Sequence, residues 1–362
     1  MKQGWEIKKL GEVATILNGY AFDSKLFSED SNDMPLIRIR DIKRGYTETF
    51  YKGDFSGEYI IRKGDYLIGM DGEFNIAEWN GKNALLNQRV CKIIANDIVD
   101  RYLFWYMPVV LKQIEDATPF VTVKHLSSKQ LLNIIIPIPP REEQEKIVAE
   151  LDCLSGIIEK KKQQLKELDA IAESLFYTMF GNPITNEKGW EVKKLKDVCI
   201  KLFAGGDVPK ENFSEVYTSQ YTVPIYSNGV GDNALYGYTN IKKVEYDSVT
   251  ISGRGTIGYC AIRKSPFYPI VRLIVAIPQT NIVLPIVLKY IIDNLDIKGA
   301  GGAIPQLTIP MIQDRSIILP PLAFQQEFAD KINEIEKLKS QIKQSIKATE
   351  ELFNSRMAYY FN

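Results

Sequence analysis

Residues 4–10 read Gly-Trp-Glu-Ile-Lys-Lys-Leu, and residues 189–195 read Gly-Trp-Glu-Val-Lys-Lys-Leu. A second pair of similar segments ends each copy: Ile138-Pro139-Pro140 with Gln144, and Leu319-Pro320-Pro321 with Gln325. Matching segments that recur in the same order, at similar separations, indicate an internal repeat. The 362-residue chain is therefore predicted to consist of one structural unit present twice, in a pseudo-twofold arrangement.

Three weaker matches lie between these segments. Residues 67–72 align with 250–255, Arg89 aligns with Arg272, and His125 aligns with Gln306. The offset drifts from 185 residues at the start of the repeat to 181 at its end, as expected when loops change length after a duplication. Similarity is high at the ends of each copy and poor inside it, so the two copies share a frame but differ in their loops.

Each copy has a strand-rich first part, at 1–136 and 189–318. Short β-branched and aromatic runs separated by Gly, Asn and Asp are typical of strands joined by turns. Helical periodicity at 99–115 and 284–295 adds one helix to each first part. The predicted class is mixed α/β, with strands at 36–39, 66–68, 90–94, 249–251 and 270–277.

The second part of each copy, 137–188 and 319–362, is predicted to be one long helix. Apolar residues recur at alternating intervals of three and four, interrupted by Lys161 and Lys339, which predicts a heptad seam. Two such seams in one chain can pair as an antiparallel coiled coil, or each helix can pack on its own strand-rich part. The predicted seam residues are Ile147, Leu151, Leu154, Ile158, Leu165, Leu168, Leu175, Phe328, Ile332, Ile335, Ile342, Ile346 and Phe353.

Composition argues against an enzyme. A single histidine, His125, removes most triad and histidine-ligated metal chemistry, and no phosphate-binding or dinucleotide-binding glycine motif is present. Asn182-Pro183 lacks the second Pro and the aromatic residue of an adenine methyltransferase loop, so it is interpreted as a helix end. The four cysteines are far apart, which predicts free thiols rather than a metal site. No apolar run approaches a membrane span and no secretory signal is evident, so we expect a cytoplasmic protein.

The formal net charge is zero, which excludes binding to nucleic acid by bulk charge alone. Lys plus Arg against Asp plus Glu is 18 to 18 in residues 1–136, 7 to 10 in 137–188, 14 to 11 in 189–318, and 6 to 6 in 319–362. Local clusters remain as candidates, such as Arg38 to Lys43 and Arg254 between two glycines. Arginine and aspartate side chains can read base edges, but an ion-paired surface loop and a tight turn are the simpler structural alternatives.

The chain resembles the specificity subunits of Type I restriction–modification enzymes. The repeated Gly-Trp-Glu motif, the two Pro-Pro pairs, and segments 175–183, 224–229 and 253–258 carry this resemblance, which covers essentially the whole chain. It implies two target recognition domains, at 1–136 and 189–318, separated by two long helices that form an antiparallel coiled coil. Each domain would read one half of a bipartite, asymmetric DNA target, and the coiled coil would set the half-site spacing.

The resemblance also implies partners. Two methyltransferase subunits, which bind S-adenosylmethionine and methylate adenine, would dock on the coiled coil, and restriction subunits would join for cleavage. This chain itself would bind double-stranded DNA, no cofactor, no metal and no membrane, and would not be catalytic. The candidate DNA-binding residues are Arg38, Arg40, Asp41, Lys43, Asp71 and Arg89 in the first domain and Ser227, Asn228, Arg254, Thr256 and Arg272 in the second. Asp71 aligns with Arg254, so this position reverses its charge between the copies.

Three other readings stay open. The chain could be the recognition subunit of a related system that lacks the translocating subunit. It could also be a structural coiled-coil protein with two accessory domains, which would self-associate without responding to DNA. A methyltransferase in its own right would bind S-adenosylmethionine as an isolated chain.

Overall fold

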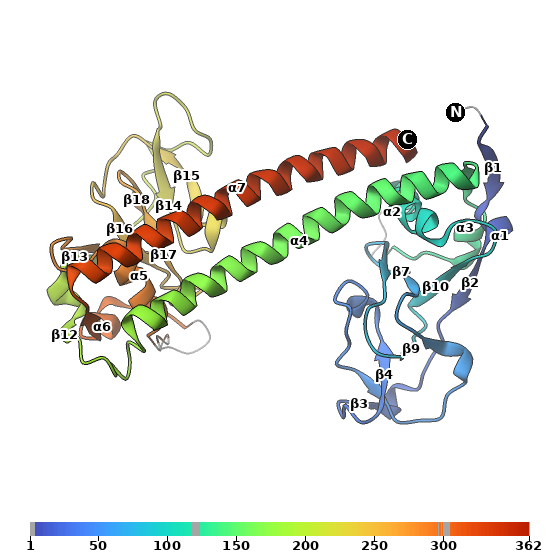
Figure 1. The fold of residues 1–362 in the computed structure, drawn as a ribbon, viewed down its shortest axis with the longest axis horizontal. Coiled ribbons are helices and arrows are strands. Elements are labelled where there is room, and N and C mark those ends of the chain that lie inside the picture. Colours follow the sequence, from blue (N-terminus) through green and yellow to red (C-terminus); the bar gives the residue numbers. More distant parts are fainter. Residues whose placement is uncertain (1–3, 118–123, 296, 298, 300–304, 362) are drawn as a thin grey trace. The chain divides into compact units, whose positions relative to one another are not determined.

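The structure is a computed structural model, which describes residues 4–117, 124–295, 297, 299 and 305–361. It forms two compact units: unit 1 contains residues 1–160 and 345–362, and unit 2 contains residues 161–344. Two helices of 40 residues, α4 (Arg141–Phe180) and α7 (Leu322–Phe361), contribute one end to each unit (Figure 1). The predicted mixed α/β class and both long helices are confirmed.

Among its described residues, unit 1 combines short strands with three further helices. The helices are α1 (Leu10–Val13), α2 (Asp100–Ala117) and α3 (Ser128–Leu132). The strands are β1 (Glu6–Lys9), β2 (Ala14–Asn18), β3 (Phe27–Ser28), β4 (Met34–Ile37), β5 (Phe50–Tyr51), β6 (Ile60–Ile61), β7 (Tyr66–Gly69), β8 (Asn75–Glu78), β9 (Ala84–Leu86), β10 (Val90–Ala95) and β11 (Ile135–Ile138).

Unit 2 has a similar set of elements. Its shorter helices are α5 (Pro285–Asp293) and α6 (Ile309–Ile312). Its strands are β12 (Glu191–Lys194), β13 (Cys199–Ala204), β14 (Val223–Tyr226), β15 (Leu235–Thr239), β16 (Ser248–Ile251), β17 (Cys260–Arg263), β18 (Tyr268–Pro269), β19 (Ile274–Pro278) and β20 (Ser316–Leu319). The predicted helices at 99–115 and 284–295 thus correspond to α2 and α5.

The two units share the topology of their main sheets. Unit 1 has a four-stranded sheet in the order β2-β10-β7-β8, and unit 2 has one in the equivalent order β13-β19-β16-β17. Helix α2 packs on β8 and β10, and α5 packs on β16, β17 and β19 (Figure 1). Smaller sheets differ, because unit 1 adds β3-β5-β4-β9-β6 and unit 2 adds β15-β14-β18. The frame is therefore repeated while the added sheets are not.

The Gly-Trp-Glu motif forms a strand that closes each unit. In unit 1 β1 pairs antiparallel with β11, and in unit 2 β12 pairs antiparallel with β20. The leucine that ends each motif is buried, and its backbone N–H donates to Ile134 O at 2.7 Å in unit 1 and to Arg315 O at 2.9 Å in unit 2. The start of each copy thus pairs with the strand that leads into its long helix, which explains why the two ends of the repeat are the most similar.

A buried glutamine anchors each long helix to its strand-rich part. Gln144 Oε1 accepts from Val99 N at 2.8 Å, and its Nε2 donates to Pro139 O at 2.9 Å. Gln325 makes the equivalent bonds, accepting from Leu284 N at 2.9 Å and donating to Pro320 O at 2.8 Å. Because an amide side chain both donates and accepts, one glutamine satisfies polar backbone groups on two segments that would otherwise be buried without partners.

Parts of α4 and α7 contact each other within each unit. In unit 1, Glu150 accepts a hydrogen bond from Tyr360 Oη and forms an ion pair with Arg356 Nε at 2.7 Å. In unit 2, Lys339 Nζ lies 2.7 Å from Asp169 Oδ1. Lys339, which interrupts the seam, is therefore neutralised by an ion pair.

Every residue of the predicted seam is buried or half-buried. Eight of its residues are buried: Ile147, Leu151, Leu154, Ile158, Phe328, Ile332, Ile335 and Ile346. The other five are half-buried: Leu165, Leu168, Leu175, Ile342 and Phe353. Ile147 and Leu151 join the core of unit 1, and Phe328 joins the core of unit 2, so part of the seam packs on the strand-rich parts.

Two predicted strands were wrong in their extent. Residues 36–39 were predicted as one strand, but β4 ends at Ile37 and a 3-10 turn takes up Ile39–Asp41. The apolar run 270–277 was also predicted as one strand, but residues 270–273 form a tight turn ahead of β19. Both errors arise because a segment rich in Ile, Leu and Val has the same sequence pattern whether it is straight or bent by backbone hydrogen bonds.

All four cysteines are free, and three of them are buried: Cys91, Cys199 and Cys260. Burial raises the pKa of the Cys91 and Cys199 thiols to about 12 and raises that of Cys260 well above its usual range. Thiolate is the reactive form, so these three are expected to be inert at pH 8. We predict that a chromogenic disulfide reagent titrates one thiol in the native protein, exposed Cys153, and four in denaturant. Cys153→Ser should abolish the native reaction, and fast reaction of a second thiol would contradict the buried assignments.

Candidate nucleic-acid interface

Asp41 holds together the loop that follows β4. Its Oδ2 accepts hydrogen bonds from Arg38 N at 2.9 Å and from Thr47 Oγ1 at 3.0 Å, and Arg40 Nε lies 3.6 Å from its Oδ1. The residue is 1% exposed. The assignment of Asp41 as a base-contacting residue is therefore corrected: it stabilises the turn, because a buried carboxylate with these partners cannot present itself to DNA.

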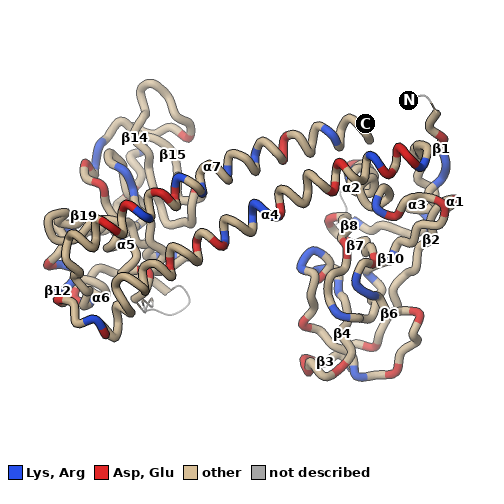
Figure 2. The backbone as a smooth tube through the Cα atoms, in the orientation of Figure 1, with Lys and Arg blue, Asp and Glu red and all other residues tan. Residues whose placement is uncertain are grey.

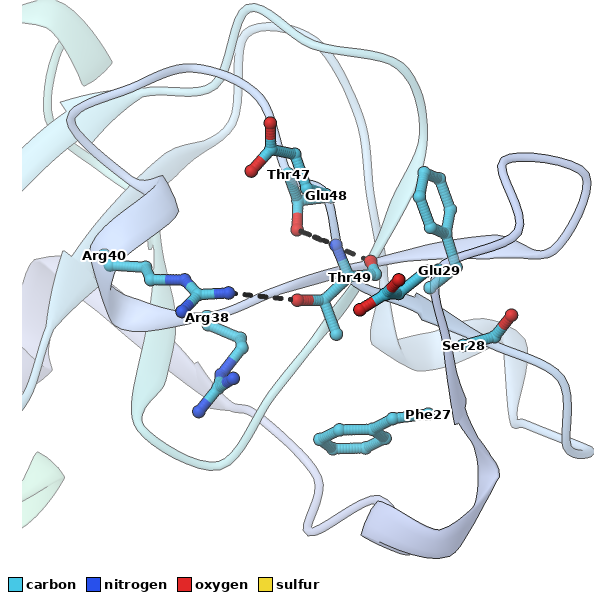
Figure 3. Close-up of a pocket in the computed structure, with 9 residues that line it drawn as sticks. Phe27, Ser28, Glu29, Arg38, Arg40, Thr47, Glu48 and Thr49 are labelled. Atoms are coloured by element: carbon cyan, nitrogen blue, oxygen red, sulfur yellow. Dashed lines mark hydrogen bonds between the residues drawn. The ribbon is translucent and has the colours of Figure 1, made fainter. Parts of the chain in front are cut away.

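Arg38 and Arg40 line a cavity of about 710 Å³ beside this loop. Figure 3 shows the two guanidinium groups on one side and Ser28 and Glu29 on the other. Arg40 Nη2 donates to Thr49 Oγ1 at 3.4 Å. Lys43, the third cation predicted here, is an exposed partner of Glu73, at 3.0 Å. The cavity carries acidic as well as basic groups, so it is a polar recess rather than a purely cationic patch.

Three polar residues from distant parts of the chain meet in unit 1. Asp71 follows β7, Arg89 precedes β10, and His125 precedes α3. Arg89 Nε lies 3.2 Å from Asp71 Oδ2, and His125 Nδ1 contacts Asp71 Oδ1. Backbone bonds fix the arrangement, since Gly72 N donates to Lys124 O at 3.0 Å and Leu126 N donates to Met70 O at 2.8 Å. We call Asp71, Arg89 and His125 the unit 1 triad.

The aligned residues meet in unit 2. Arg254 follows β16, Arg272 precedes β19, and Gln306 precedes α6. Arg254 donates to Gln306 Oε1 from Nη2 at 3.0 Å and from Nε at 3.3 Å, and Arg272 Nη1 donates to the same oxygen at 3.4 Å. Leu307 N donates to Gly253 O at 2.8 Å, as Leu126 N does to Met70 O in unit 1. We call Arg254, Arg272 and Gln306 the unit 2 triad.

Asn228 positions the unit 2 triad. Its Nδ2 donates to Val271 O at 2.8 Å, and its Oδ1 accepts from Gly253 N at 2.8 Å. Through its amide nitrogen and its amide oxygen, the side chain therefore joins the segments that carry Arg254 and Arg272. Asn228 thus has a structural role in this arrangement, and its predicted contact with DNA stays a prediction.

The turn before β19 has an unusual backbone. Val271 and Arg272 have φ angles of 51° and 61°. A left-handed conformation is uncommon for any residue other than glycine and is an outlier for a β-branched one. Such strain costs on the order of 1–3 kcal/mol per residue and persists where surrounding bonds enforce it. Here Asn228 and backbone bonds from Val271 N to Gly206 O and from Arg272 N to Gly205 O enforce it.

The two remaining predicted residues of unit 2 are Ser227, next to Asn228, and Thr256, two residues after Arg254. Ser227 is half-buried and donates through Oγ to Asn228 O at 3.4 Å. Thr256 is exposed in the Gly-flanked loop after Arg254. His125 and Gln306 were not among the predicted DNA-binding residues, although the repeat aligns them with each other, as it aligns Asp71 with Arg254 and Arg89 with Arg272.

The described residues lack two further kinds of feature. Among them, no three His, Cys, Asp or Glu side chains gather as ligands for a metal ion. Within the same residues, none of the helices combines the length and the apolar character needed to cross a bilayer.

Comparison with known proteins gives a consistent result. Residues 2–170 and 187–348 match the family described as "Type I restriction modification DNA specificity domain". The chain is 34% identical over 226 residues to the EcoBI specificity subunit of a Type I restriction enzyme of Escherichia coli, covering 62% of this chain and 46% of that protein. It is 25% identical over 367 residues to the putative type I specificity subunit S.MpnORF507P of Mycoplasma pneumoniae, covering 97% and 95%. The chain thus spans about half of the first relative and nearly all of the second.

Solved structures agree on the fold. The S subunit of a Type I restriction-modification system from M. genitalium aligns over 99% of this chain and 96% of its own, with a TM-score of 0.63 and 13% identity. The chain therefore has the fold of a specificity subunit. Because the family match extends over both copies of the repeat, this chain belongs to the specificity-subunit family of Type I restriction–modification systems, a family of DNA-recognition proteins.

Proposed function

We propose that this chain is the sequence-recognition subunit of a Type I restriction–modification complex, in which unit 1 reads one half of a bipartite DNA target and unit 2 reads the other. The observation that carries the proposal is the pair of triads: one frame presents different polar side chains at equivalent places. Different reading groups select different bases, so the two half-sites differ and the target is asymmetric.

The long helices set the distance between half-sites in this proposal. We infer an antiparallel coiled coil with a pseudo-twofold relation between the repeats. The contacts within each unit support it: Glu150 of α4 meets Arg356 and Tyr360 of α7, whereas Asp169 meets Lys339. Partner numbers fall along α7 as they rise along α4, as antiparallel pairing requires.

Partner subunits supply the chemistry and much of the affinity. Specific DNA binding depends strongly on phosphate contacts, and this chain has no net charge. Figure 2 shows Lys and Arg interspersed with Asp and Glu along both long helices. We therefore propose that two methyltransferase subunits, carrying S-adenosylmethionine, dock on the helices and contribute phosphate contacts. Restriction subunits would join this complex for cleavage.

Replacing residues 1–136 with the matching part of another family member tests the division of labour. The hybrid, expressed with its methyltransferase subunit, is expected to methylate a target with one new half-site and one unchanged half-site. Genome-wide methylation mapping in cells with and without each protein measures this directly. The reciprocal exchange of residues 189–318 is the matched control and should change the other half. Alteration of both halves by one exchange would overturn the proposal.

A further inference from the structure

The two triads occupy equivalent places but present opposite hydrogen-bonding groups. In each triad the first residue follows the third strand of the main sheet, counted in sheet order, and the second residue precedes the second strand. The third residue lies in the segment before α3 or α6. In unit 1 the central group is a carboxylate, which only accepts hydrogen bonds when ionised. In unit 2 the aligned group is a guanidinium, which only donates. The shared frame therefore places an acceptor in one unit where it places a donor in the other.

The unit 2 triad has donors in excess. Two guanidinium groups, each with five N–H donors, share a single amide oxygen of Gln306. No described carboxylate forms an ion pair with Arg254 or Arg272. Two cations held side by side by one neutral acceptor leave most of their donors without a partner among the residues that the structure describes. Such a pair matches a ligand with closely spaced acceptors, as guanine offers with O6 and N7 in the major groove.

The backbone keeps Arg272 in this place despite a conformational cost. Its left-handed φ, and that of Val271, are enforced by the Asn228 bridge and by backbone bonds from the segment after β13. Strain of this kind concentrates at functional sites, where the surrounding structure holds a residue in the geometry that its function requires. Arg272 is exposed and Arg254 is half-buried, so the pair is accessible to a ligand.

The unit 1 triad is organised around its acceptor. Asp71 is 21% exposed at its side chain, and Arg89 and His125 each contact a different one of its oxygens. A carboxylate has about four lone-pair sites, so it can accept a further hydrogen bond from an amino group. Cytosine presents its N4 amino group in the major groove, and an acidic side chain is its usual partner.

We propose that the triads are equivalent base-reading sites of opposite sign: Arg254 and Arg272 bind the acceptor edge of a guanine, and Asp71 accepts a hydrogen bond from the amino group of a cytosine. Gln306 and His125 are positioning residues that orient these groups. This inference rests on the proposed function, because it assigns the base contacts of the two recognition units.

The test uses the full chain in complex with its methyltransferase subunit, with methylated sites mapped for each variant. Arg254→Ala is expected to relax the preference for guanine at one position of the unit 2 half-site, by about 5- to 150-fold. Arg254→Lys keeps the charge but not the planar fork, so it should lose the same preference. Arg315→Ala, an exposed arginine of unit 2 away from the triad sequence, is the matched control and should leave the target unchanged.

Transplanting the unit 2 triad into unit 1 is the reciprocal experiment. Asp71→Arg combined with His125→Gln recreates the unit 2 triad in unit 1, next to Arg89. One position of the unit 1 half-site is expected to change from cytosine to guanine, with the unit 2 half-site unchanged. Gln306→Leu should relax the same guanine as Arg254→Ala, whereas a purely structural glutamine would lower the melting temperature and leave the base preference intact.

Three outcomes would overturn the inference. If Arg254→Ala weakened DNA binding equally on all sequences and reduced the salt dependence of binding, the arginine would be a phosphate contact. A folded transplant with an unaltered target would remove the unit 1 assignment. Absence of sequence-directed methylation with the wild-type chain would refute the proposed function itself, and this inference with it. Methylation mapping with the wild-type chain thus distinguishes failure of this inference from failure of the proposed function.

Discussion

Adding one heptad to each long helix is expected to abolish methylation of the original target. We propose that α4 and α7 pair antiparallel, so insertions after Gln164 and after Lys343 would lie opposite each other. Seven helical residues add about 10 Å, or about three base pairs of DNA. The same shift rotates the DNA by roughly 100°, given about 10.5 base pairs per turn. We expect at least a 100-fold loss at the original spacing, and any new target should have a spacer about three base pairs longer.

Inserting three heptads at the same points separates length from rotation. Twenty-one residues add about 31 Å, close to the 34–36 Å of one DNA turn, so each unit would again face its groove. This variant is expected to methylate a target whose spacer is about nine or ten base pairs longer, and to do so better than the one-heptad variant.

An insertion in α4 alone is the control. This insertion moves Asp169 relative to Glu150 along α4, so the pairs with Lys339 and Arg356 of α7 cannot both form. The variant should therefore lose activity at every spacing. An active complex that keeps the original spacer after matched insertions would refute the role of the helices in spacing.

The frame could be predicted from the sequence because its signals are local. The Gly-Trp-Glu motif and the Pro-Pro pairs identified the repeat, and the structure shows that they mark the two strands that pair to close each unit. The long helices were evident from a heptad pattern over 40 residues. The prediction of which helix residues are buried was less accurate, because α4 faces both a strand-rich part and α7. Phe176 and Phe180 are fully buried, whereas heptad spacing selected Leu175, which is half-buried.

The candidate interface was only partly predictable. The aligned pairs Asp71 with Arg254 and Arg89 with Arg272 were found from the repeat, but whether they meet depends on the pairing of strands far apart in the chain. His125 lies 54 residues from Asp71, and no local pattern joins them. The burial of Asp41 was also hidden from the sequence, because an aspartate that closes a turn and one that faces solvent have the same neighbours in the chain.

Phe328 is expected to be a highly sensitive position of unit 2. Its side chain is fully buried where α7 meets α4 and α5, with ring centroids 5.1 Å from Phe180, 5.9 Å from Phe176 and 5.1 Å from Tyr290. Removing a phenylalanine from such a core loses its apolar burial and leaves a cavity between three elements that cannot all collapse onto it, at a cost of about 3–5 kcal/mol. Typical domains have only about 5–15 kcal/mol of stability.

Phe328→Ala should therefore lower the free energy of unfolding of unit 2 by about 3–5 kcal/mol, measured by urea denaturation. Hydrogen exchange should rise first in unit 2, while the core of unit 1, where Phe361 packs on Tyr102 and Tyr106, keeps its protection. Phe324→Ala, one turn earlier in the same helix at a residue 46% exposed, is the control and should cost less than about 1 kcal/mol. Equal effects of the two substitutions, or simultaneous loss of protection in both units, would contradict this account, because the cost would then not arise from the aromatic core that joins α4, α5 and α7.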